Sequence, residues 1–258
     1  MNYIDTHAHY NDEAFSEDRE RVLADVRDAG CVAVVNCAED YPSSLECVRL
    51  AEEHPFVFAA VGVHPHKALT YSPEIAEKIR ELAQSCKKVV AIGEAGLDYH
   101  YDFSPRDVQK VCFAENIRLA RELGKPVVVH DREAHEDTLE IMKNERIPEG
   151  GAVLHCFSGS AETAKIVAKH GWYFSIGGAV TFKNARRVIE ALEVIPDDLL
   201  MLETDCPYMT PVPFRGTRNN SALIPYTAAA IAAVKGVSTE EIFALTTANA
   251  KRFFGINV

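Results

Sequence analysis

The sequence predicts a (β/α)8 TIM barrel, an α/β fold in which eight parallel strands alternate with helices. Short apolar runs rich in β-branched residues alternate with longer segments of helical periodicity, the pattern typical of βα units around a parallel sheet. The alternation occurs eight times. No Gly-rich dinucleotide-binding turn follows the first strand, which disfavours an open doubly wound sheet.

The apolar runs give the expected strands: Tyr3 to His7, Val32 to Cys37, Val57 to Val63, Val89 to Glu94, Pro126 to His130, Ala152 to His155, Trp172 to Ile176 and Leu199 to Glu203. The segments between them give the expected helices: Glu17 to Ala29, Pro42 to Glu53, Pro73 to Ser85, Pro105 to Leu123, Glu133 to Asn144, Ala161 to Lys169 and Ala185 to Val194. After the last strand, a loop from Pro207 to Asn220 leads to two closing helices, Leu223 to Lys235 and Thr239 to Phe254.

Residues typical of helix ends support these segments. Ser16, Ser72 and Ser104 precede three of the expected helices, and at the last two a proline follows in the first turn. Gly30, Gly124 and Gly171 follow helices, where a left-handed residue commonly ends the last turn.

The chain of 258 residues is long enough for one large domain or two small ones. No linker, low-complexity tract or long block of like charge interrupts it, so we expect a single TIM-barrel domain over residues 1–258. The first strand begins without a preceding signal segment, and no apolar run approaches membrane-spanning length. We therefore expect a cytoplasmic protein that has no membrane association and no obligate protein partner.

Seven cysteines without a Cys-x-x-Cys pair indicate reduced thiols rather than a disulfide framework. Cys156 and Cys206 directly follow His155 and Asp205. Strand alternation turns their side chains away from those residues and toward the surrounding helices, so we expect both thiols to be packing residues.

The formal net charge of −11 argues against binding of nucleic acid through a broad basic surface. A polyanionic substrate would need local positive charge. Bound divalent cations supply such charge in many sites, so the acidic composition is compatible with a metal-dependent enzyme.

Histidines and acids recur where the predicted strands end. The stretch Asp5-Thr6-His7-Ala8-His9 places His7 and His9 on one face of the first strand, although an isolated His-x-His often recurs by chance. In a (β/α)8 barrel the catalytic residues lie at the carboxyl ends of the strands, and six of the eight ends carry possible ligands. These residues are His7, His9, His64, His66, Glu94, His130, His155, Glu203 and Asp205.

The donor set predicts a metal centre with two divalent ions. His7, His9, Glu94 and Asp205 can form one site, and His130 with His155 can form a second if Glu94 bridges the two. Two ions activate water and stabilise the attacking and leaving oxygens of a phosphodiester displacement. Asp205 is either a metal ligand alone or also the base that accepts the proton of the attacking water.

Other polar residues near the strand ends have more than one possible role. We expect His64 to contact a substrate phosphate, with bracing of the metal site as the alternative for His64 and His66. Arg132 and Arg215 have guanidinium groups suited to phosphate. Glu203 either binds a third metal, orients a ligand histidine or has no ligand role. Histidine-rich ligation suits zinc or manganese and carboxylate-rich ligation suits magnesium, so the metal stays open.

Nearly the whole chain resembles the TatD-type metal-dependent deoxyribonucleases of the amidohydrolase superfamily. The similarity is carried by the order and spacing of several motifs: Asp5 to His9, Gly62 to His66, Gly93 to Tyr99, Glu203 to Tyr208, Pro211 to Gly216 and Thr247 to Phe254. It implies a TIM barrel, metal ligands at His7, His9, Glu94, His130, His155 and Asp205, and hydrolysis of DNA or RNA phosphodiesters. It also implies 3′-to-5′ exonuclease action on the ends of single strands. Ala95 and the segment Asn219-Asn220-Ser221 depart from the family pattern without removing a proposed ligand.

Two alternatives to a nuclease follow from the same residues. A related barrel hydrolase would cleave a small amide, a lactone or a phosphotriester with the same histidine pair. Many such enzymes place a carboxylated lysine at the end of strand four, where this chain has Glu94 and no lysine after Lys88. The second alternative is a metal-binding scaffold without an activity.

Overall fold

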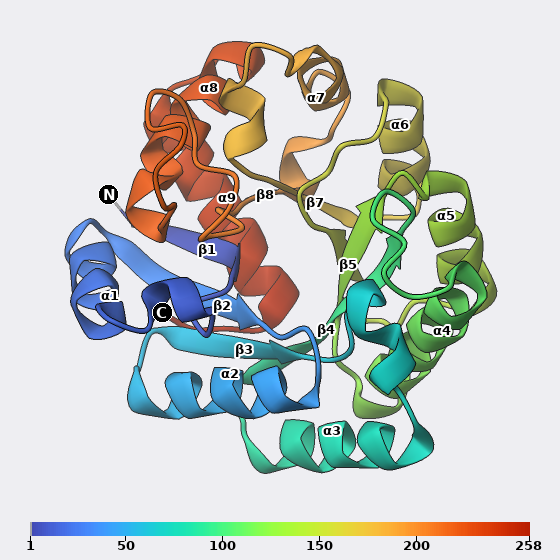
Figure 1. Cartoon of the computed structure of the whole chain (residues 1–258). Coiled ribbons are helices and arrows are strands. Elements are labelled where there is room, and N and C mark those ends of the chain that lie inside the picture. The colour runs from blue at the N-terminus through green and yellow to red at the C-terminus, as the bar shows by residue number, and fades with distance from the viewer. Residues whose placement is uncertain (1) are drawn as a thin grey trace. The chain divides into compact units, whose positions relative to one another are not determined.

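The computed structural model describes residues 2–258 and has eight strands in one parallel sheet, ordered along the chain from β1 to β8. This order, with a helix after each strand, confirms the predicted (β/α)8 barrel (Figure 1). The strands are β1 (Tyr3–Ala8), β2 (Cys31–Cys37), β3 (Val57–Val61), β4 (Val89–Asp98), β5 (Val127–Arg132), β6 (Ala152–Leu154), β7 (Tyr173–Ile176) and β8 (Leu200–Leu202).

The helices agree closely with the predicted segments. They are α1 (Arg19–Asp28), α2 (Tyr41–Glu53), α3 (Pro73–Ser85), α4 (Arg106–Leu123), α5 (His135–Asn144), α6 (Ala161–Lys169), α7 (Arg186–Leu192), α8 (Ile224–Lys235) and α9 (Thr239–Phe254). Short 3-10 helices that the sequence did not predict lie between these elements: η1 (Glu13–Phe15), η2 (Pro65–Thr70), η3 (Gly178–Thr181), η4 (Asp197–Leu199) and η5 (Ser221–Leu223).

The predicted helix-capping serines differ in outcome. Ser72 caps α3 by accepting a hydrogen bond from the backbone of Ile75, and Gly124 ends α4 with a φ of 63°, both as predicted. Ser16 instead ends η1, because α1 begins later, after Asp18. Ser104 does not cap α4, whose N-cap is Pro105.

No single helix within residues 2–258 combines the length and the apolar composition needed to cross a membrane. The pair Ser221–Lys235 and Thr239–Phe254 meets that requirement jointly but is bent by 105°.

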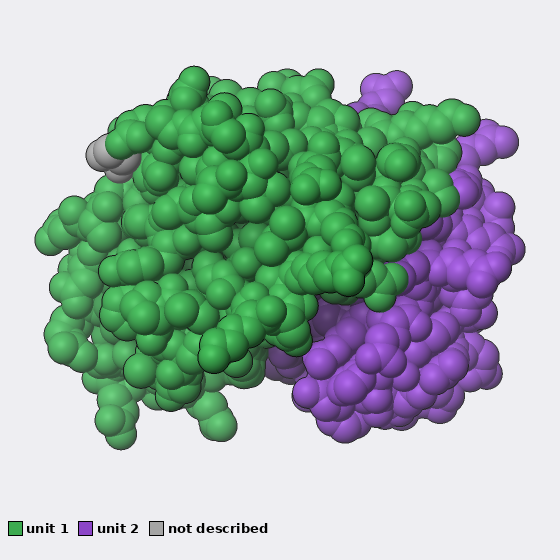
Figure 2. All heavy atoms as spheres, turned by 90° about the horizontal axis from the view of Figure 1, so that it is seen from above, with its two compact units in different colours: residues 1–36, 156–258 green, residues 37–155 purple. Residues whose placement is uncertain are grey.

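Two compact units make up the chain (Figure 2). The first unit combines Met1–Asn36 with Cys156–Val258, and the second is Cys37–His155. We describe each unit by itself, and the single-domain organisation stays a prediction.

In the first unit, the beginning and the end of the chain come together. Ala8, the last residue of β1, forms a parallel β-bridge with Cys206, which follows β8. Helix α9 packs against both strands, and in Figure 1 it lies beside them in red. Tyr3 stacks on Phe243 of this helix with ring centroids 5.3 Å apart. The residues after β1 and those after β8 therefore share one end of the sheet.

In the second unit, β3, β4, β5 and β6 pair in succession, and every residue of β4 is buried. Strand β4 is four residues longer than predicted and reaches Asp98, so Glu94 lies within the strand and does not end it. The extension runs through Gly96, which pairs with His130 of β5. A Cβ atom at Gly96 would lie 1.9 Å from the carbonyl oxygen of His130, so only glycine permits this close strand pairing.

The seven cysteines are thiols rather than disulfides, as predicted. Cys206 is fully buried, which agrees with a packing role. Cys156 is only partly buried and lines a cavity, which disagrees with its predicted packing role.

Candidate metal centre

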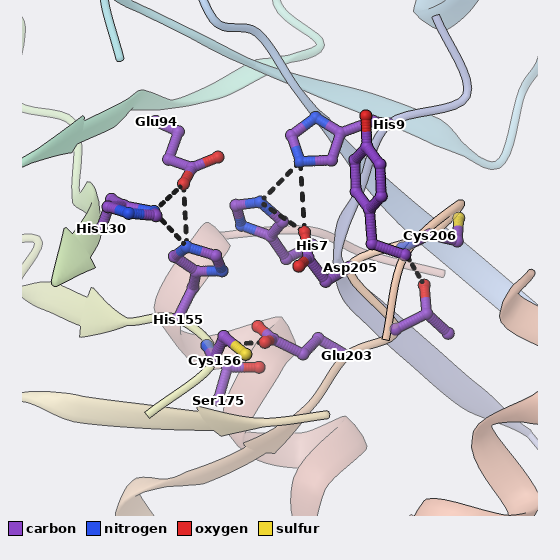
Figure 3. Close-up of polar contacts among 12 residues, drawn as sticks. His7, His9, Glu94, His130, His155, Cys156, Ser175, Glu203, Asp205 and Cys206 are labelled. Carbon is purple, nitrogen blue, oxygen red and sulfur yellow. Dashed lines mark hydrogen bonds and ion pairs between the residues drawn. The ribbon is translucent and has the colours of Figure 1, made fainter. Parts of the chain in front are cut away.

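The first unit contains a cluster that we call the His7 set: His7, His9 and Asp205. Nε2 of His7 lies 3.2 Å from Nε2 of His9, as expected for residues two apart on a strand. Oδ1 of Asp205 lies 3.3 Å from Nε2 of His9 and 3.9 Å from Nε2 of His7 (Figure 3). Three predicted ligands therefore converge on one point.

The backbone around Asp205 explains how its carboxylate reaches the two histidines. Its amide donates a hydrogen bond to the carbonyl oxygen of His7 at 2.9 Å. Its φ of 55° is left-handed, a conformation that aspartate tolerates better than most residues. The turn thereby directs the side chain of Asp205 toward His7 and His9.

Asp5 holds both halves of the His7 set in place, a role that the sequence analysis missed. Its buried carboxylate accepts hydrogen bonds from the amide of His7 at 3.2 Å, and from the amide and hydroxyl of Thr204 at 3.0 and 2.6 Å. Ser221 donates a further hydrogen bond at 2.6 Å. Burial raises the pKa of Asp5 to about 7, against the effect of these hydrogen bonds. Asp5 and His7 are two residues apart on β1 and so lie on the same face of the strand. This spacing is the feature of the sequence that could have identified Asp5.

Glu203 is buried beside this set. Its Oε1 accepts a hydrogen bond from the amide of Cys156 at 2.6 Å, as Figure 3 shows. Ligand atoms of His7 and Glu203 lie within 4.8 Å of each other. Glu203 is therefore well placed to orient or extend the His7 set.

The second unit contains the Glu94 set: Glu94, His64, His130 and His155. Oε1 of Glu94 lies 2.6 Å from Nδ1 of His130, 2.8 Å from Nε2 of His155 and 3.3 Å from Nε2 of His64. Three imidazole nitrogens thus surround one carboxylate oxygen, and Figure 3 shows two of these contacts. The sequence predicted all four residues as site residues.

The position of His64 bears on its predicted role as a phosphate contact. Burial lowers the pKa of His64 to about 3, with the neighbouring Glu94 acting in the opposite direction. The imidazole is therefore neutral at neutral pH. Its ligand atom is grouped with those of Glu94 and His130 within 4.8 Å, a spacing compatible with direct metal ligation.

A second residue that the sequence analysis missed is Asp98, at the end of β4. Its Oδ2 lies 3.1 Å from Nε2 of His130 and 2.9 Å from Nε2 of His66. Its Oδ1 accepts hydrogen bonds from the amides of His100 and Tyr101. Although burial opposes it, this hydrogen bonding holds the pKa of Asp98 well below its usual range. Asp98 and Glu94 share a strand parity, but the strand was predicted to end at Glu94.

The residues predicted to contact phosphate have partners of their own. His66 lies against Asp98, which supports bracing as its role. The guanidinium carbon of Arg132 lies 4.7 Å from the ring centre of Tyr101. That of Arg215 lies 3.9 Å from the ring centre of Phe182, and Nη1 donates to the carbonyl oxygen of Thr210.

The His7 set fits a divalent cation by its spacing, and the Glu94 set has the donor types of a cation site at closer, hydrogen-bond distances. Atoms that bind one Zn²⁺ at about 2.0–2.2 Å lie roughly 3–4 Å from one another. The nitrogen and oxygen atoms of the His7 set are 3.2 to 3.9 Å apart, within this range. In the Glu94 set, Asp98 on the far nitrogen of His130 forms the carboxylate–histidine arrangement that orients metal ligands.

Comparison with known proteins gives the chain a family. The family described as TatD related DNase matches residues 4–255. The metal-dependent hydrolase YabD of Bacillus subtilis (strain 168) is 45% identical over 98% of this chain and 99% of its own length. The 3′-5′ ssDNA/RNA exonuclease TatD of Klebsiella pneumoniae (strain 342) is 38% identical over 95% and 94%.

Among solved structures, YJJV, a TatD homologue from Escherichia coli K12, superposes with a TM-score of 0.93. It is 28% identical, and the match covers 99% of this chain and 98% of that one. The fold, the motifs and these relatives agree, and this chain belongs to the TatD-related DNase family of metal-dependent hydrolases.

Proposed function

We propose that the protein is a metal-dependent phosphodiesterase that removes nucleotides from the 3′ ends of single-stranded DNA or RNA. The observation that carries the proposal is the convergence of imidazole and carboxylate groups in the His7 set and the Glu94 set. Relatives named as 3′-5′ ssDNA/RNA exonucleases support the choice of substrate.

The fold suggests how the two sets act together. In a (β/α)8 barrel the carboxyl ends of all strands open onto one face. We propose that the six residues His7, His9, Glu94, His130, His155 and Asp205 hold two divalent ions, with Glu94 as the shared ligand. When bound, such ions activate water and stabilise the attacking and leaving oxygens of an in-line displacement.

Side chains of the protein would perform the remaining tasks, which are proton transfer, phosphate contact and orientation of the ligands. Asp205, whose side chain is 17% exposed, would accept a proton from the attacking water. His64 would donate a hydrogen bond to the substrate phosphate from a neutral imidazole, or complete the ligands of the Glu94 set. Asp98 and His66 would keep His130 in position. Glu203 is the proposed ligand of a third ion, if one binds.

An acidic chain suits a substrate bound by its end. The net charge of −11 provides no broad basic groove, so affinity must come from metal ions and a few cations near a terminal phosphate. A strand end needs only such a small site. Single strands can also splay their bases against aromatic side chains.

The test uses metal-free protein to which magnesium, manganese or zinc is added back. The substrate is a single strand labelled at its 5′ end. We expect a ladder that shortens from the unlabelled 3′ end, release of nucleoside 5′-monophosphates and slower action on intact duplex. Internal cuts alone, or cleavage that a chelator does not stop, would overturn the proposal. A parallel panel of small amides, lactones and phosphotriesters tests the alternative barrel hydrolase.

A further inference from the structure

A cavity of about 340 Å³ opens in the first unit, among segments that follow β6, β7 and β8. Its walls are mainly apolar and include Phe157, Ile176, Val180, Phe182 and Met209. The volume lies at the lower end of the range for small-molecule sites, enough for one planar ring system with its sugar. None of the residues proposed above for metal binding or catalysis lines it.

The cavity adjoins the proposed centre through Glu203. Cys156, which lines the cavity, donates its amide hydrogen to Oε1 of Glu203 at 2.6 Å. A Cβ atom on Gly177, another lining residue, would lie 3.4 Å from Cγ of Glu203. A ligand in the cavity would therefore be separated from Glu203 by little more than a glycine.

The lining has few polar side chains, and two of them, Asn184 and Arg187, are suited to a nucleotide. Asn184 offers an amide donor and acceptor, the pair that an asparagine presents to a base edge. Arg187 offers a guanidinium, which suits phosphate. Both belong to the segment Phe182–Arg187, which carries three cations and no acid in a chain of net charge −11. A purely aliphatic ligand would form no hydrogen bond with either of these two side chains.

We propose that this cavity binds the base of the nucleotide at the strand end that the enzyme cleaves. The inference rests on the proposed nuclease function. Phe182 and the aliphatic walls cover the faces of the ring, Asn184 meets its edge, and the exposed Arg187 contacts a phosphate of the strand other than the one that is cleaved. Arg215, stacked 3.9 Å from the centre of the Phe182 ring, holds this aromatic side chain in place.

Two neighbouring arginines allow a matched comparison. Arg187 lines the cavity, whereas Arg186 pairs with Glu190 through a 2.7 Å contact and is not part of the lining. We expect Arg187→Ala to raise KM for a single-stranded oligonucleotide about tenfold with little change in kcat, as loss of one binding contact does. Arg186→Ala should leave both constants unchanged. Equal effects of the two substitutions would overturn the role of Arg187.

The role of the base is tested with the metal-loaded enzyme and two oligonucleotide substrates that differ only in their last residue. One strand ends in an ordinary 3′ nucleotide, and the other ends in a residue that lacks its base. In the unsubstituted enzyme the abasic end should raise KM roughly tenfold, the scale of one lost base–aromatic contact. Ala179→Phe, which fills the cavity, should abolish the difference, and Asn184→Ala should reduce it. Equal KM values for the two substrates in the unsubstituted enzyme would overturn the proposed base-binding role of the cavity and would leave the proposed nuclease function intact.

A binding measurement separates failure of the cavity from failure of the function. If neither strand is cleaved, the proposed function is wrong, and calorimetry with 2′-deoxyadenosine decides about the cavity. Binding that Ala179→Phe weakens at least tenfold, with thermal unfolding unchanged, supports the base site. If Ala179→Phe unfolds, Asn184→Ala takes its place. Absence of 2′-deoxyadenosine binding, or equal affinity in the unsubstituted protein and the variant, overturns the proposed base site.

Discussion

Nε2 of His130 lies 3.1 Å from the buried carboxylate of Asp98, while Nδ1 of the same ring faces Glu94 at 2.6 Å. A carboxylate therefore lies beside each ring nitrogen, and Asp98 is placed to accept a proton carried on Nε2. With a metal ion in the Glu94 set, this contact would favour the tautomer that leaves Nδ1 available as a ligand. The orientation of His130 thus depends on Asp98, which has no proposed role as a metal ligand or a substrate contact.

We expect Asp98→Asn to weaken metal binding by about 10–100-fold, because partners of this kind set the orientation and basicity of a ligand histidine. Metal affinity measured by titration of the metal-free protein checks this. Asp102→Asn is the control, since Asp102 is an exposed residue paired with Arg106 on the same segment. Unchanged affinity in Asp98→Asn would show that His130 needs no such partner.

Glu94→Ala should reduce turnover far more than His64→Ala. The carboxylate oxygen of Glu94 meets three imidazoles, so its loss disorganises the whole set, whereas His64 accounts for one contact. We expect turnover to fall at least about a thousandfold in Glu94→Ala and roughly 10–100-fold in His64→Ala. Steady-state kinetics with metal content determined for each variant provides the measurement. Similar mild losses would contradict a shared ligand at Glu94.

Cys206→Ser should leave turnover near normal while lowering the urea midpoint of unfolding. The thiol is fully buried, and burial raises its pKa well above the usual range, so it acts as an apolar packing group. A hydroxyl there costs about 1–3 kcal/mol unless it finds a hydrogen-bond partner. A collapse of activity with intact metal content would instead place this side chain in the reaction.

The pair of Asp18 and Arg218 should make stability sensitive to acid. Two parallel contacts of 2.8 and 2.7 Å join the carboxylate to the guanidinium. Hydrogen bonds from Arg218 and then Arg21 lower the pKa of Asp18 to about 2. The unfolded value is about 3.9, so the stabilisation is complete well above pH 4 and is lost as pH falls toward 2.

The corresponding experiment compares Asp18→Asn with the unsubstituted protein. The gap between their urea midpoints should be wider at pH 7 than at pH 3. It should also narrow in high salt, because both side chains reach solvent. A gap independent of pH would mean that the carboxylate charge contributes nothing.

The elements and most of the site could be predicted because both depend on local pattern. Alternation placed His7 and His9 together, and their nitrogens are 3.2 Å apart. The end of β4 could not be predicted, since glycine usually weakens a strand. Gly96 continues it because β5 approaches too closely for a side chain, and that approach depends on a partner distant in sequence. Asp98 was missed for this reason.

Contacts made over long sequence separations account for the other omissions. Asp5 meets Thr204 and Ser221, about 200 residues away along the chain, so nothing local identifies it as an anchor. The cavity likewise draws its walls from segments after three strands. The partial exposure of Cys156 could not be predicted, because the chain leaves the strand at Leu154 and a φ of 43° at Cys156 departs from strand geometry.

The division of the chain into two units has a consequence for its synthesis on the ribosome. All members of the Glu94 set lie between His64 and His155, within one continuous unit. Domains fold as they emerge from the ribosome, and every residue of this set has been synthesised while the last hundred or so residues are still untranslated. His7 and His9 are synthesised first, but Asp205 is synthesised much later. The earliest histidines of the nascent protein are therefore the last to acquire their carboxylate.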